Sequence, residues 1–422
     1  MYKIPREGFD DRIWGIRMKI IFGFSLFLCI FYLLGQAYAY QDVSVPGDAN
    51  DDKIVSADEL SAAENDFEDG KISEQALESI RIIQSSYPRR ISDSTGKEIT
   101  FYKPVERIAV LTTEDYEILR TLNSTDKVVA AGKYVVQSRE QGCGDLYIDG
   151  KNLVNVGSPT SAVDWEALIK TKPDLVITYM SSPKQADLDQ NLKDTNITVI
   201  RLDSGNISQY LDIVNKMGYL LDRTGEAETY SRFFEEKLGK YLDAASSISV
   251  SDRPRVYLEA DFGGGQTYYT CGSGHAHNAL LTAAGGNNVF SDLEGFKQVD
   301  PESVAMKNPD VILRYKYLKD SPGIDKDLSD TSALQALRDE MLGRAELNRT
   351  PAVANKKVYI FTWDCTKGGG RFFLGMGYLG KWLQPEIFKD YSPREAYQEY
   401  LDQFQRTKVD VVNKGVFVYP EA

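Results

Sequence analysis

The stretch "VDWEALIKTKPDLVI" at 163–177 returns in similar form as "VDPESVAMKNPDVIL" at 299–313. Five of the fifteen positions are identical, and most of the others exchange one apolar residue for another. Each copy predicts a short helix that leads through Pro-Asp into a buried strand, with Asp164 and Asp300 as N-caps and Pro301 at the first helical position. The repeat therefore predicts two similar βα lobes that face each other across a cleft.

Around these copies, apolar strands alternate with helices, which is typical of βαβ units and a largely parallel sheet. In the first half, the sequence predicts strands near 107–111, 128–132, 174–178 and 197–202, and helices near 114–122, 164–171 and 184–193. In the second half, it predicts strands near 255–260, 310–314 and 357–361, and helices near 276–285, 301–307, 332–345, 372–384 and 392–405.

A single long helix is expected between the two halves, from Gly225 to Ser246. Its apolar stripe consists of Phe234, Leu238, Tyr241, Leu242 and Ala245. At about 1.5 Å per residue such a helix spans roughly 33 Å, enough to cross two small domains. No Gly/Pro/Ser-rich tether accompanies it, so the sequence predicts a rigid strut that permits only a small closure of the lobes.

The chain has 422 residues and a formal net charge of −13. This length favours two or three domains, and the acidity disfavours nucleic acids and anionic membrane surfaces as partners. We expect a monomer of the α/β class. Its expected parts are a leader at 1–39, an acidic module at 46–87, an N-terminal lobe at 89–222, a connecting helix at 223–249 and a C-terminal lobe at 250–422.

The N-terminus has the pattern of an export signal. Arg17 and Lys19 precede an apolar run at 20–34, and Ala37-Tyr38-Ala39 has the small-x-small form of a signal-peptidase site. Met18 is an alternative start. An uncleaved membrane anchor is the competing interpretation, although the run is short for a spanning helix. Either way, the protein is expected at the cell surface or in a periplasm-like space.

Export permits disulfide bonds. Beyond the leader the cysteines are Cys143, Cys271 and Cys365, an odd number that allows at most one pair. Cys271 and Cys365 are the pair that would tie together two loops at the ends of neighbouring strands.

The segment 46–87 carries eleven acidic and three basic side chains. Its first loop follows the spacing of an EF-hand calcium loop, with oxygen ligands expected from Asp48, Asn50, Asp52, Ile54 (carbonyl), Ser56 and Glu59. Position 6, where a glycine normally makes the sharp turn, is Lys53. The second loop, at 65–76, has lost most of its ligands and ends in Ala76.

Two such loops, each followed by a short helix, resemble a degenerate dockerin module. The resemblance implies calcium-stabilised docking or spacing, with a cohesin-like partner. The alternative is an acidic, solvated linker that folds poorly.

The larger body, 89 to about 405, resembles the substrate-binding proteins of ABC importers, in the class that binds cobalamin and ferric siderophores and has a rigid inter-lobe helix. The resemblance rests on the order and spacing of several phrases: "RISDSTGKEITFYKPVERIAVL", the two repeat copies, "MGYLLDRTGEAETYSRFFEEKL", "AAGGNNVF" and "GYLGKWLQPEIF". It implies that Glu166 and Glu302, at matching positions of the repeat, dock the lobes onto arginine pockets of the permease. A glutamate in the first turn also stabilises a helix simply through the helix dipole.

Ligands of open α/β sheets bind at the carboxyl ends of the strands. In this sequence those ends supply Thr113, Lys133, Tyr134, Ser158, Tyr179, Tyr268, Tyr269, His275, His277, Arg314, Tyr315, Trp363 and Arg371. Both triple glycines, 263–265 and 368–370, fall there, where the backbone must approach something closely or bend sharply. Neither fits a nucleotide-binding fingerprint.

Arg314 and Arg371 would suit an anionic chelate, or would instead pair with acidic neighbours. The histidines, with Cys271 and Cys365, could hold a metal or an axial position of a macrocycle. Alternatively, His275 caps the following helix and His277 is a hydrogen-bonded surface residue. Two or three of Tyr268, Tyr269, Tyr315, Tyr317 and Trp363 are expected to form flat walls of the cleft.

The function favoured by the sequence is non-catalytic: capture of an iron or cobalt chelate (corrinoid, haem or siderophore) and delivery to an importer permease. No catalytic cofactor is expected. The alternatives are a secreted enzyme carrying a dockerin, and an adhesin or scaffold. The enzyme is disfavoured because neither HExxH nor GxSxG occurs.

Overall fold

The structure is a computed structural model that describes residues 43–137, 146–261, 267–316, 330–362, 365 and 368–421. The predicted leader, the triple glycine at 263–265, Cys143, Tyr317 and Trp363 lie outside the described residues. Val45–Ala422 form one compact unit. No helix of the described part is long and apolar enough to cross a membrane.

The N-terminal lobe contains a five-stranded parallel sheet in the order β5-β4-β3-β8-β9. Its strands are β3 (Ile108–Val110), β4 (Val128–Ala131), β5 (Val154–Asn155), β8 (Leu175–Tyr179) and β9 (Thr198–Leu202). The helices between and after them are α4 (Thr113–Thr121), α5 (Lys133–Val136), α6 (Trp165–Lys170), α7 (Gln185–Leu192) and α8 (Ile207–Leu220). Two small hairpins accompany the sheet, β1 (Arg89–Ser92) with β2 (Glu98–Phe101) and β6 (Gly157–Ser158) with β7 (Ala162–Val163).

The C-terminal lobe has its own sheet, in the order β13-β11-β10-β14-β15-β16, with β12 also paired to β10. Its strands are β10 (Arg255–Asp261), β11 (Tyr269–Cys271), β12 (Asn287–Asn288), β13 (Phe296–Gln298), β14 (Val311–Lys316), β15 (Val358–Thr362) and β16 (Val418–Tyr419). Its helices are α11 (Ala276–Ala283), α12 (Pro301–Lys307), α13 (Ser332–Leu342), α14 (Pro351–Ala354), α15 (Phe372–Leu383), α16 (Pro385–Phe388) and α17 (Pro393–Tyr400). The three strands predicted here, β10, β14 and β15, are parallel.

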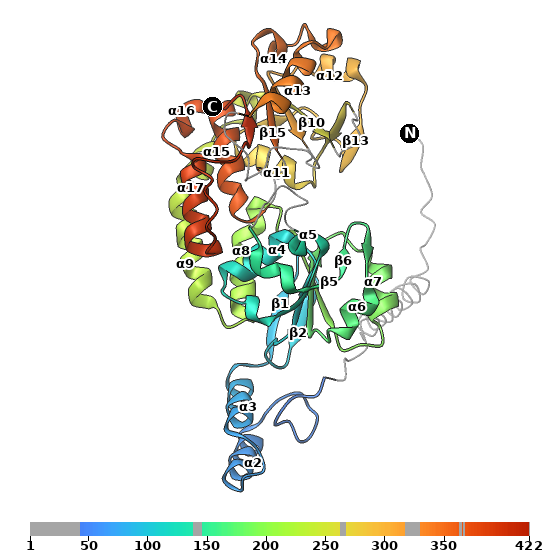
Figure 1. Cartoon of the computed structure of the whole chain (residues 1–422), viewed down its shortest axis with the longest axis vertical. Helices are drawn as coiled ribbons and strands as arrows, with labels where there is room; N and C mark the ends of the chain where they lie inside the picture. Colours follow the sequence, from blue (N-terminus) through green and yellow to red (C-terminus); the bar gives the residue numbers. More distant parts are fainter. Residues whose placement is uncertain are drawn as a thin grey trace, which may run out of the picture. The chain divides into compact units, whose positions relative to one another are not determined.

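The two repeat copies lie in different sheets, as predicted: one runs through α6 into β8, the other through α12 into β14 (Figure 1). The predicted caps are confirmed. Asp164 accepts a hydrogen bond from the backbone of Ala167, Asp300 accepts one from Glu302, and Pro301 opens α12.

The correspondence between the copies extends to backbone detail. Lys172 and Asn308, at matching positions, both adopt the left-handed conformation with φ of 49°. Two residues later, the backbone N–H groups of Asp174 and Asp310 donate to the carbonyls of Arg107 and Arg255, each at 2.8 Å. Because each arginine stands at the start of its lobe's central strand, the same contact locks helix, turn and strand together in both lobes.

The predicted strut is present as one helical run with a π-helical turn inside it: α9 (Thr224–Phe234), the π segment Glu235–Gly239 and α10 (Lys240–Ser246). Four members of the predicted stripe are buried, and Leu242 is partly buried against the same core. Tyr241 stacks on Phe388 at 5.0 Å, and Phe234 lies 5.7 Å from Phe373, ring centroid to ring centroid. Aromatic contacts along its length thus hold this helix against the C-terminal helices.

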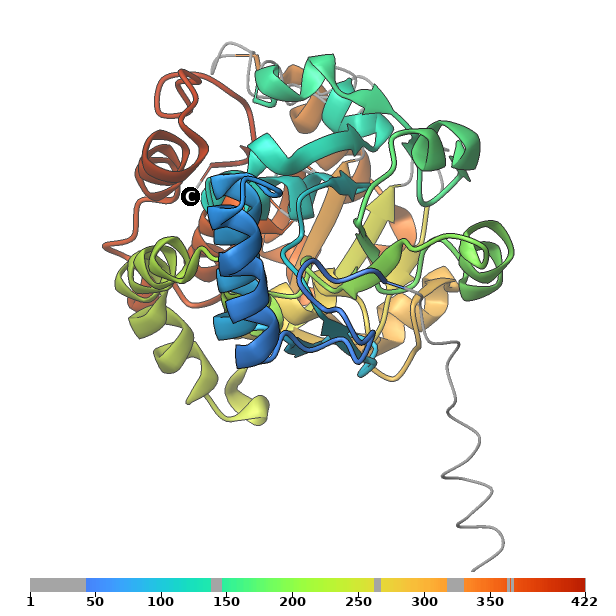
Figure 2. The same ribbon diagram turned by 90° about the horizontal axis from the view of Figure 1, so that it is seen from below.

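The acidic segment folds as two helices, α2 (Ala57–Glu68) and α3 (Glu74–Ser86), rather than as a solvated linker (Figure 2). Ser56 and Glu59 form a capping box at the start of α2. Leu77, Ile80 and Ile83 of α3 are buried in the same apolar cluster as the N-terminal lobe. The pair of helices therefore shares a core with the body of the protein.

Candidate functional site

Helix α4 follows the carboxyl end of β3, and all nine of its residues are buried. It contacts the α9 helix, the 3-10 turn Gly369–Arg371 and the π-helical turn Leu401–Gln405. We call this region, α4 with Tyr147, 368–371 and 400–405, the lobe junction. Four of the buried α4 side chains carry a carboxyl or guanidinium group, namely Glu114, Asp115, Glu117 and Arg120. Burial on this scale requires partners for each of them.

Glu114 faces the end of strand β8. The hydroxyl of Tyr179 donates to Glu114 Oε2 at 2.9 Å, and that of Thr113 donates to the same oxygen at 2.9 Å. Burial, together with the charge of Glu114, raises the pKa of Tyr179 well above its ordinary value. Both predicted residues, Thr113 and Tyr179, thus lie at the strand ends as expected, gathered around a glutamate that the sequence analysis did not select.

Asp115 is the second carboxyl of the junction. It accepts hydrogen bonds from the hydroxyls of Thr112 (2.5 Å) and Ser204. Burial raises the pKa of Asp115 to about 7, and the charges of Glu114 and Asp203 add to the rise. A carboxyl that titrates near neutrality therefore sits directly beneath the strand ends.

We expect Asp115→Asn to flatten the pH dependence of stability between about pH 4 and 7. The folded pKa, about 7, lies above the unfolded value of 3.8, so the folded state holds a proton that the unfolded state has released. Stability contributed by Asp115 is therefore complete below pH 4 and lost as the pH rises to 7. Urea unfolding across this range measures the difference, with Asp212→Asn, an exposed aspartate, as control. Parallel profiles for the parent and Asp115→Asn would contradict the assignment.

Arg371 and Glu117 form an ion pair across the junction. Arg371 Nη2 lies 2.6 Å from Glu117 Oε1, and each side chain is only 1% exposed. The hydroxyls of Tyr147 and Tyr400 also contact Glu117, the latter at 3.3 Å. Arg371 was predicted as a ligand-binding residue, but this pairing makes it the bond between α4 and the start of α15, because burial favours a charge only beside its counter-charge.

The triple glycine at 368–370 is explained by the same junction. A Cβ on Gly368 would lie 1.9 Å from the carbonyl oxygen of Ser204, and one on Gly370 would lie 1.8 Å from the ring of Tyr400. Gly369 has φ of 75° and packs against Glu117. The prediction that the backbone approaches something closely here is confirmed: Gly368 and Gly369 approach the other lobe, and Gly370 approaches a ring of its own lobe.

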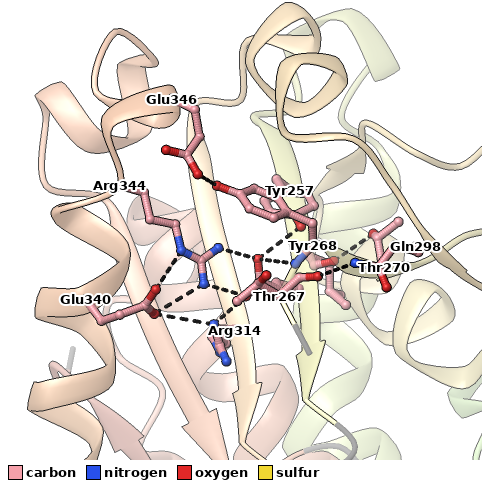
Figure 3. Close-up of polar contacts among 11 residues, drawn as sticks. Tyr257, Thr267, Tyr268, Thr270, Gln298, Arg314, Glu340, Arg344 and Glu346 are labelled. Carbon is pink, nitrogen blue, oxygen red and sulfur yellow. Dashed lines mark hydrogen bonds and ion pairs between the residues drawn. The ribbon is translucent and has the colours of Figure 1, made fainter. Parts of the chain in front are cut away.

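A second charged cluster lies in the C-terminal lobe beneath α13 (Figure 3). Glu259 on β10 is fully buried and binds Arg314 of β14 and Arg344, the latter through Nη1 at 2.7 Å and Nη2 at 3.0 Å. Glu340 on α13 contacts both arginines from the solvent side, at 3.5 and 2.8 Å. Arg314 thus pairs with acidic neighbours, the alternative that the sequence left open, and lies on the sheet face that α13 covers.

Tyr268 belongs to this cluster. It is 6% exposed, its hydroxyl contacts Glu346, and the guanidinium of Arg344 lies 4.8 Å above its ring. Its backbone N–H donates to Glu259 at 3.2 Å. Its ring fills the core beneath α13, and the expectation that two or three of the five aromatic residues form walls of the cleft stays a prediction.

The histidines and Tyr315 form a stack on the opposite sheet face. His275 caps α11 by accepting from the backbone of His277, as one interpretation proposed. His277 is 3% exposed, which excludes the surface position, and its ring lies 4.1 Å from that of Tyr315. Burial lowers the pKa of His275 to about 4 and holds that of His277 well below its ordinary value, so both rings are neutral at physiological pH. Tyr315 is fully buried in this stack.

The predicted disulfide is wrong. Cys271 and Cys365 are both buried thiols, and Cys365 Sγ donates to the carbonyl of Phe417 at 3.6 Å. Strands β10 and β14 separate β11 from β15, so the sheet holds the two loops apart. Among the described residues, no group of three or more His, Cys, Asp or Glu side chains is placed to hold a metal ion.

The remaining predicted residues differ in their exposure. Lys133 and Tyr134 open α5 and are half-buried, with the ammonium 5.8 Å from the ring centroid. Tyr269 is half-buried and stacks on Phe296 at 5.6 Å. Ser158 is buried and bonds Thr160 at 3.0 Å. Lys133, Tyr134, Tyr179 and Tyr269 are thus predicted strand-end residues that retain partial access to solvent.

A surface pocket of about 410 Å³ lies at the amino ends of the strands of the C-terminal sheet. Its lining includes Arg253, Asp310 and Lys357, which precede strands β10, β14 and β15. Arg253 is occupied in capping, because it donates to the carbonyls of Ala245 and Ser246 at the end of α10. The pocket is thus remote from the carboxyl ends of the strands.

The first acidic loop has the hydrogen bonding of an ordered turn. Asp48 accepts from the backbone of Asp52 (3.2 Å) and Lys53 (2.9 Å). Lys53 adopts φ of 69°, the conformation for which position 6 usually requires glycine. Glu59 accepts from Ala49 and Ser56, and these hydrogen bonds lower its pKa to about 2. Glu59 is therefore ionised at neutral pH, while calcium binding by the loop stays a prediction.

We expect calcium at about 10 to 100 times its dissociation constant to stabilise the parent by about 1.4–2.7 kcal/mol. Asp48→Ala should abolish the effect because it removes the first ligand of the loop. Asp69→Ala, in the degenerate second loop, should retain it. Thermal unfolding with calcium, with magnesium and with chelator measures this. Equal curves with calcium and chelator would show that the loop is held by its hydrogen bonds alone.

The proposed docking residues lie at matching places on the surface. Glu166 and Glu302 are both exposed, each in the first turn of its helix behind the capping aspartate. Neither forms an ion pair with another described residue. In the view of Figure 1, α6 and α12 lie on the side of their lobes away from α9.

Comparison with known proteins identifies the family. Residues 108–363 match the family described as periplasmic binding protein. The molybdate-binding protein MolA of Haemophilus influenzae is 24% identical over 353 residues, which cover 76% of this chain and 91% of that protein. A cobalamin-binding protein of Halobacterium salinarum is 25% identical over 264 residues, 59% of this chain and 62% of that protein.

Solved structures show the same fold. A TroA-like periplasmic binding protein, FepB from Veillonella parvula, has a TM-score of 0.61 at 21% identity and covers 79% of this chain and 100% of that one. MolA bound to molybdate has a TM-score of 0.57 at 21% identity, with coverages of 76% and 98%. With two separate sheets, a helical strut and a family match over more than half its length, this chain belongs to the periplasmic binding protein family.

Proposed function

We propose that this protein captures a metal chelate (a corrinoid, a haem or a ferric siderophore) outside the cytoplasmic membrane and delivers it to the permease of an ABC importer. The observation that carries the proposal is the arrangement of the two sheets, whose carboxyl strand ends are joined through the lobe junction. Ligands of α/β proteins bind at such ends. The family is one of solute-binding proteins, and relatives are named for cobalamin and molybdate.

The described strand ends support a ligand larger than a bare ion. Tyr134, Tyr179 and Tyr269 provide half-buried aromatic surface, which suits a ligand with extended apolar or planar parts. The two arginines expected to bind anions are engaged with Glu117 and Glu259. The neutral histidines are held by helix capping and ring stacking. A ligand whose metal is already coordinated by the ligand's own groups suits this site, because it needs no metal ligands from these side chains.

Delivery would use the two exposed glutamates, Glu166 and Glu302, as feet on the permease. Because α6 and α12 project them from equivalent turns, their separation is fixed by the rigid body of the protein. The strut and the buried ion pair of the junction keep that separation constant between the free and the loaded protein. The permease would then recognise the loaded protein by the ligand that its loops hold, and not by a large closure of the two lobes.

Thermal unfolding of the purified full chain with a panel of ligands tests the proposal. The panel contains aquocobalamin, cyanocobalamin, haemin, a ferric hydroxamate, a ferric catecholate and molybdate. A ligand at about 100 times its dissociation constant stabilises the protein by about 2.7 kcal/mol, and a corrinoid or haem also shifts its visible absorbance. A response to molybdate alone, or to none of the six, would overturn capture of a chelate.

A further inference from the structure

Helices α6 and α12 present equivalent faces, so a difference between them is chemical and not geometric. Both begin behind a capping aspartate, and both are followed, at matching positions of the repeat, by a left-handed residue with φ of 49°. Glu166 and Glu302 occupy the same position in the repeat. Four residues further on, on the same helix face, the first copy has Lys170 and the second has Met306.

Met306 is 78% exposed, the highest value among the large apolar side chains of the described residues. The neighbouring Lys307 does not cover it: its ammonium lies 3.6 Å from Asp292 and 5.5 Å from the ring centroid of Phe290. Beneath the helix, Val304 is fully buried and anchors α12 to the core. The exposed face of α12 thus combines one carboxylate with one thioether side chain.

We propose that Glu302 and Met306 act together as a mixed foot on the permease, with Met306 entering an apolar socket beside the cation that receives Glu302. This rests on the proposed function. The N-terminal foot, Glu166 with Lys170, is purely ionic. The two feet are therefore not interchangeable, and the protein docks in one orientation although its lobes are alike.

The partner at this surface is the importer permease, because Met306 lies on the same face of α12 as Glu302, the carboxylate proposed to dock there. Methionine is unbranched and flexible, so it fills irregular apolar sockets. Ionic contacts weaken with salt, whereas burial of a thioether does not. The mixed foot consequently supplies the part of the docking affinity that persists at high ionic strength.

Photo-cross-linking in the producing cells identifies what α12 touches. Met306 is replaced by p-benzoylphenylalanine in the full chain, and Val250, 64% exposed on the 3-10 turn Val250–Asp252, is replaced as the matched control. The expected result is an adduct between position 306 and an ABC-importer permease, identified by mass spectrometry, with none from position 250. An adduct with a second copy of this chain, with a different protein, or equally from both positions would overturn the proposal.

Binding to that permease in nanodiscs then separates the two feet. Met306→Ser is expected to weaken binding roughly tenfold at both about 0.1 and 0.5 M NaCl. Lys170→Ser should have an effect only at the lower salt. Because both side chains are exposed, the melting temperatures should not change. If Met306→Ser binds like the parent while Glu302→Lys does not bind, the mixed foot is wrong and docking by the glutamates stands. If Glu166→Lys and Glu302→Lys both bind like the parent, the docking part of the proposed function fails.

Discussion

Arg371→Met is expected to lower the free energy of unfolding by about 3–5 kcal/mol, because it leaves the carboxylate of Glu117 buried without its counter-charge. Both side chains are 1% exposed, so water cannot replace the guanidinium. The two tyrosine hydroxyls that contact Glu117 are too weak to replace a full charge. Chemical denaturation at neutral pH measures the loss.

The double variant Glu117→Gln with Arg371→Met should recover much of that loss, since removing both charges costs far less than removing one. The matched control is Arg81→Met, whose partner Glu64 and the arginine itself are nearly half exposed. A surface pair of this kind contributes no more than about 1 kcal/mol. Equal losses for Arg371→Met and Arg81→Met would show that the junction is solvated.

Glu259→Gln should destabilise the C-terminal lobe by a similar amount, about 3–5 kcal/mol. Glu259 is 0% exposed and lies between Arg314 and Arg344, which are 4% and 7% exposed. The glutamine amide can accept from one guanidinium but cannot neutralise two. Equilibrium unfolding in urea should show a lower midpoint with an unchanged slope.

Glu340→Gln provides the comparison for this cluster because it touches the same two arginines from a side chain that is 48% exposed. Glu340→Gln should lower the free energy of unfolding by no more than about 1 kcal/mol, since water solvates the guanidinium groups that lose the contact. A larger loss of stability from Glu340→Gln than from Glu259→Gln would contradict the prediction, because it would show that the exposed glutamate and not the buried one stabilises the cluster.

The fold was predictable because its signals are local and repeated. The helix-Pro-Asp-strand phrase states the same turn twice, and the structure shows why: Lys172 and Asn308 adopt one backbone conformation that the following proline and aspartate secure. The apolar stripe of the strut was equally readable. The short strands β11, β13 and β16 were missed because a strand of two or three residues shows no periodicity. Their positions depend on pairing with strands that are distant in the sequence.

The site was less predictable, because strand-end position does not tell which way a side chain points. Arg314 and Tyr315 are consecutive on β14 and were both expected in the cleft, yet they lie on opposite sheet faces, each buried. The partner of Arg371 stands 254 residues away. One signal was available: four carboxyl or guanidinium side chains within the short helix Thr113–Thr121, directly after a buried strand, indicate a helix whose charges need partners.

The π turn at Glu235–Gly239 has a consequence for protein engineering. Each residue of an α-helix turns the chain by about 100°, and a π turn accommodates a surplus residue within an otherwise α-helical run. Because the π turn absorbs that surplus residue, deleting one residue within Glu235–Gly239 would turn the strut into continuous α-helix while the residues on either side keep facing their present neighbours. The π turn is thus the place where the strut tolerates a change of length by one residue.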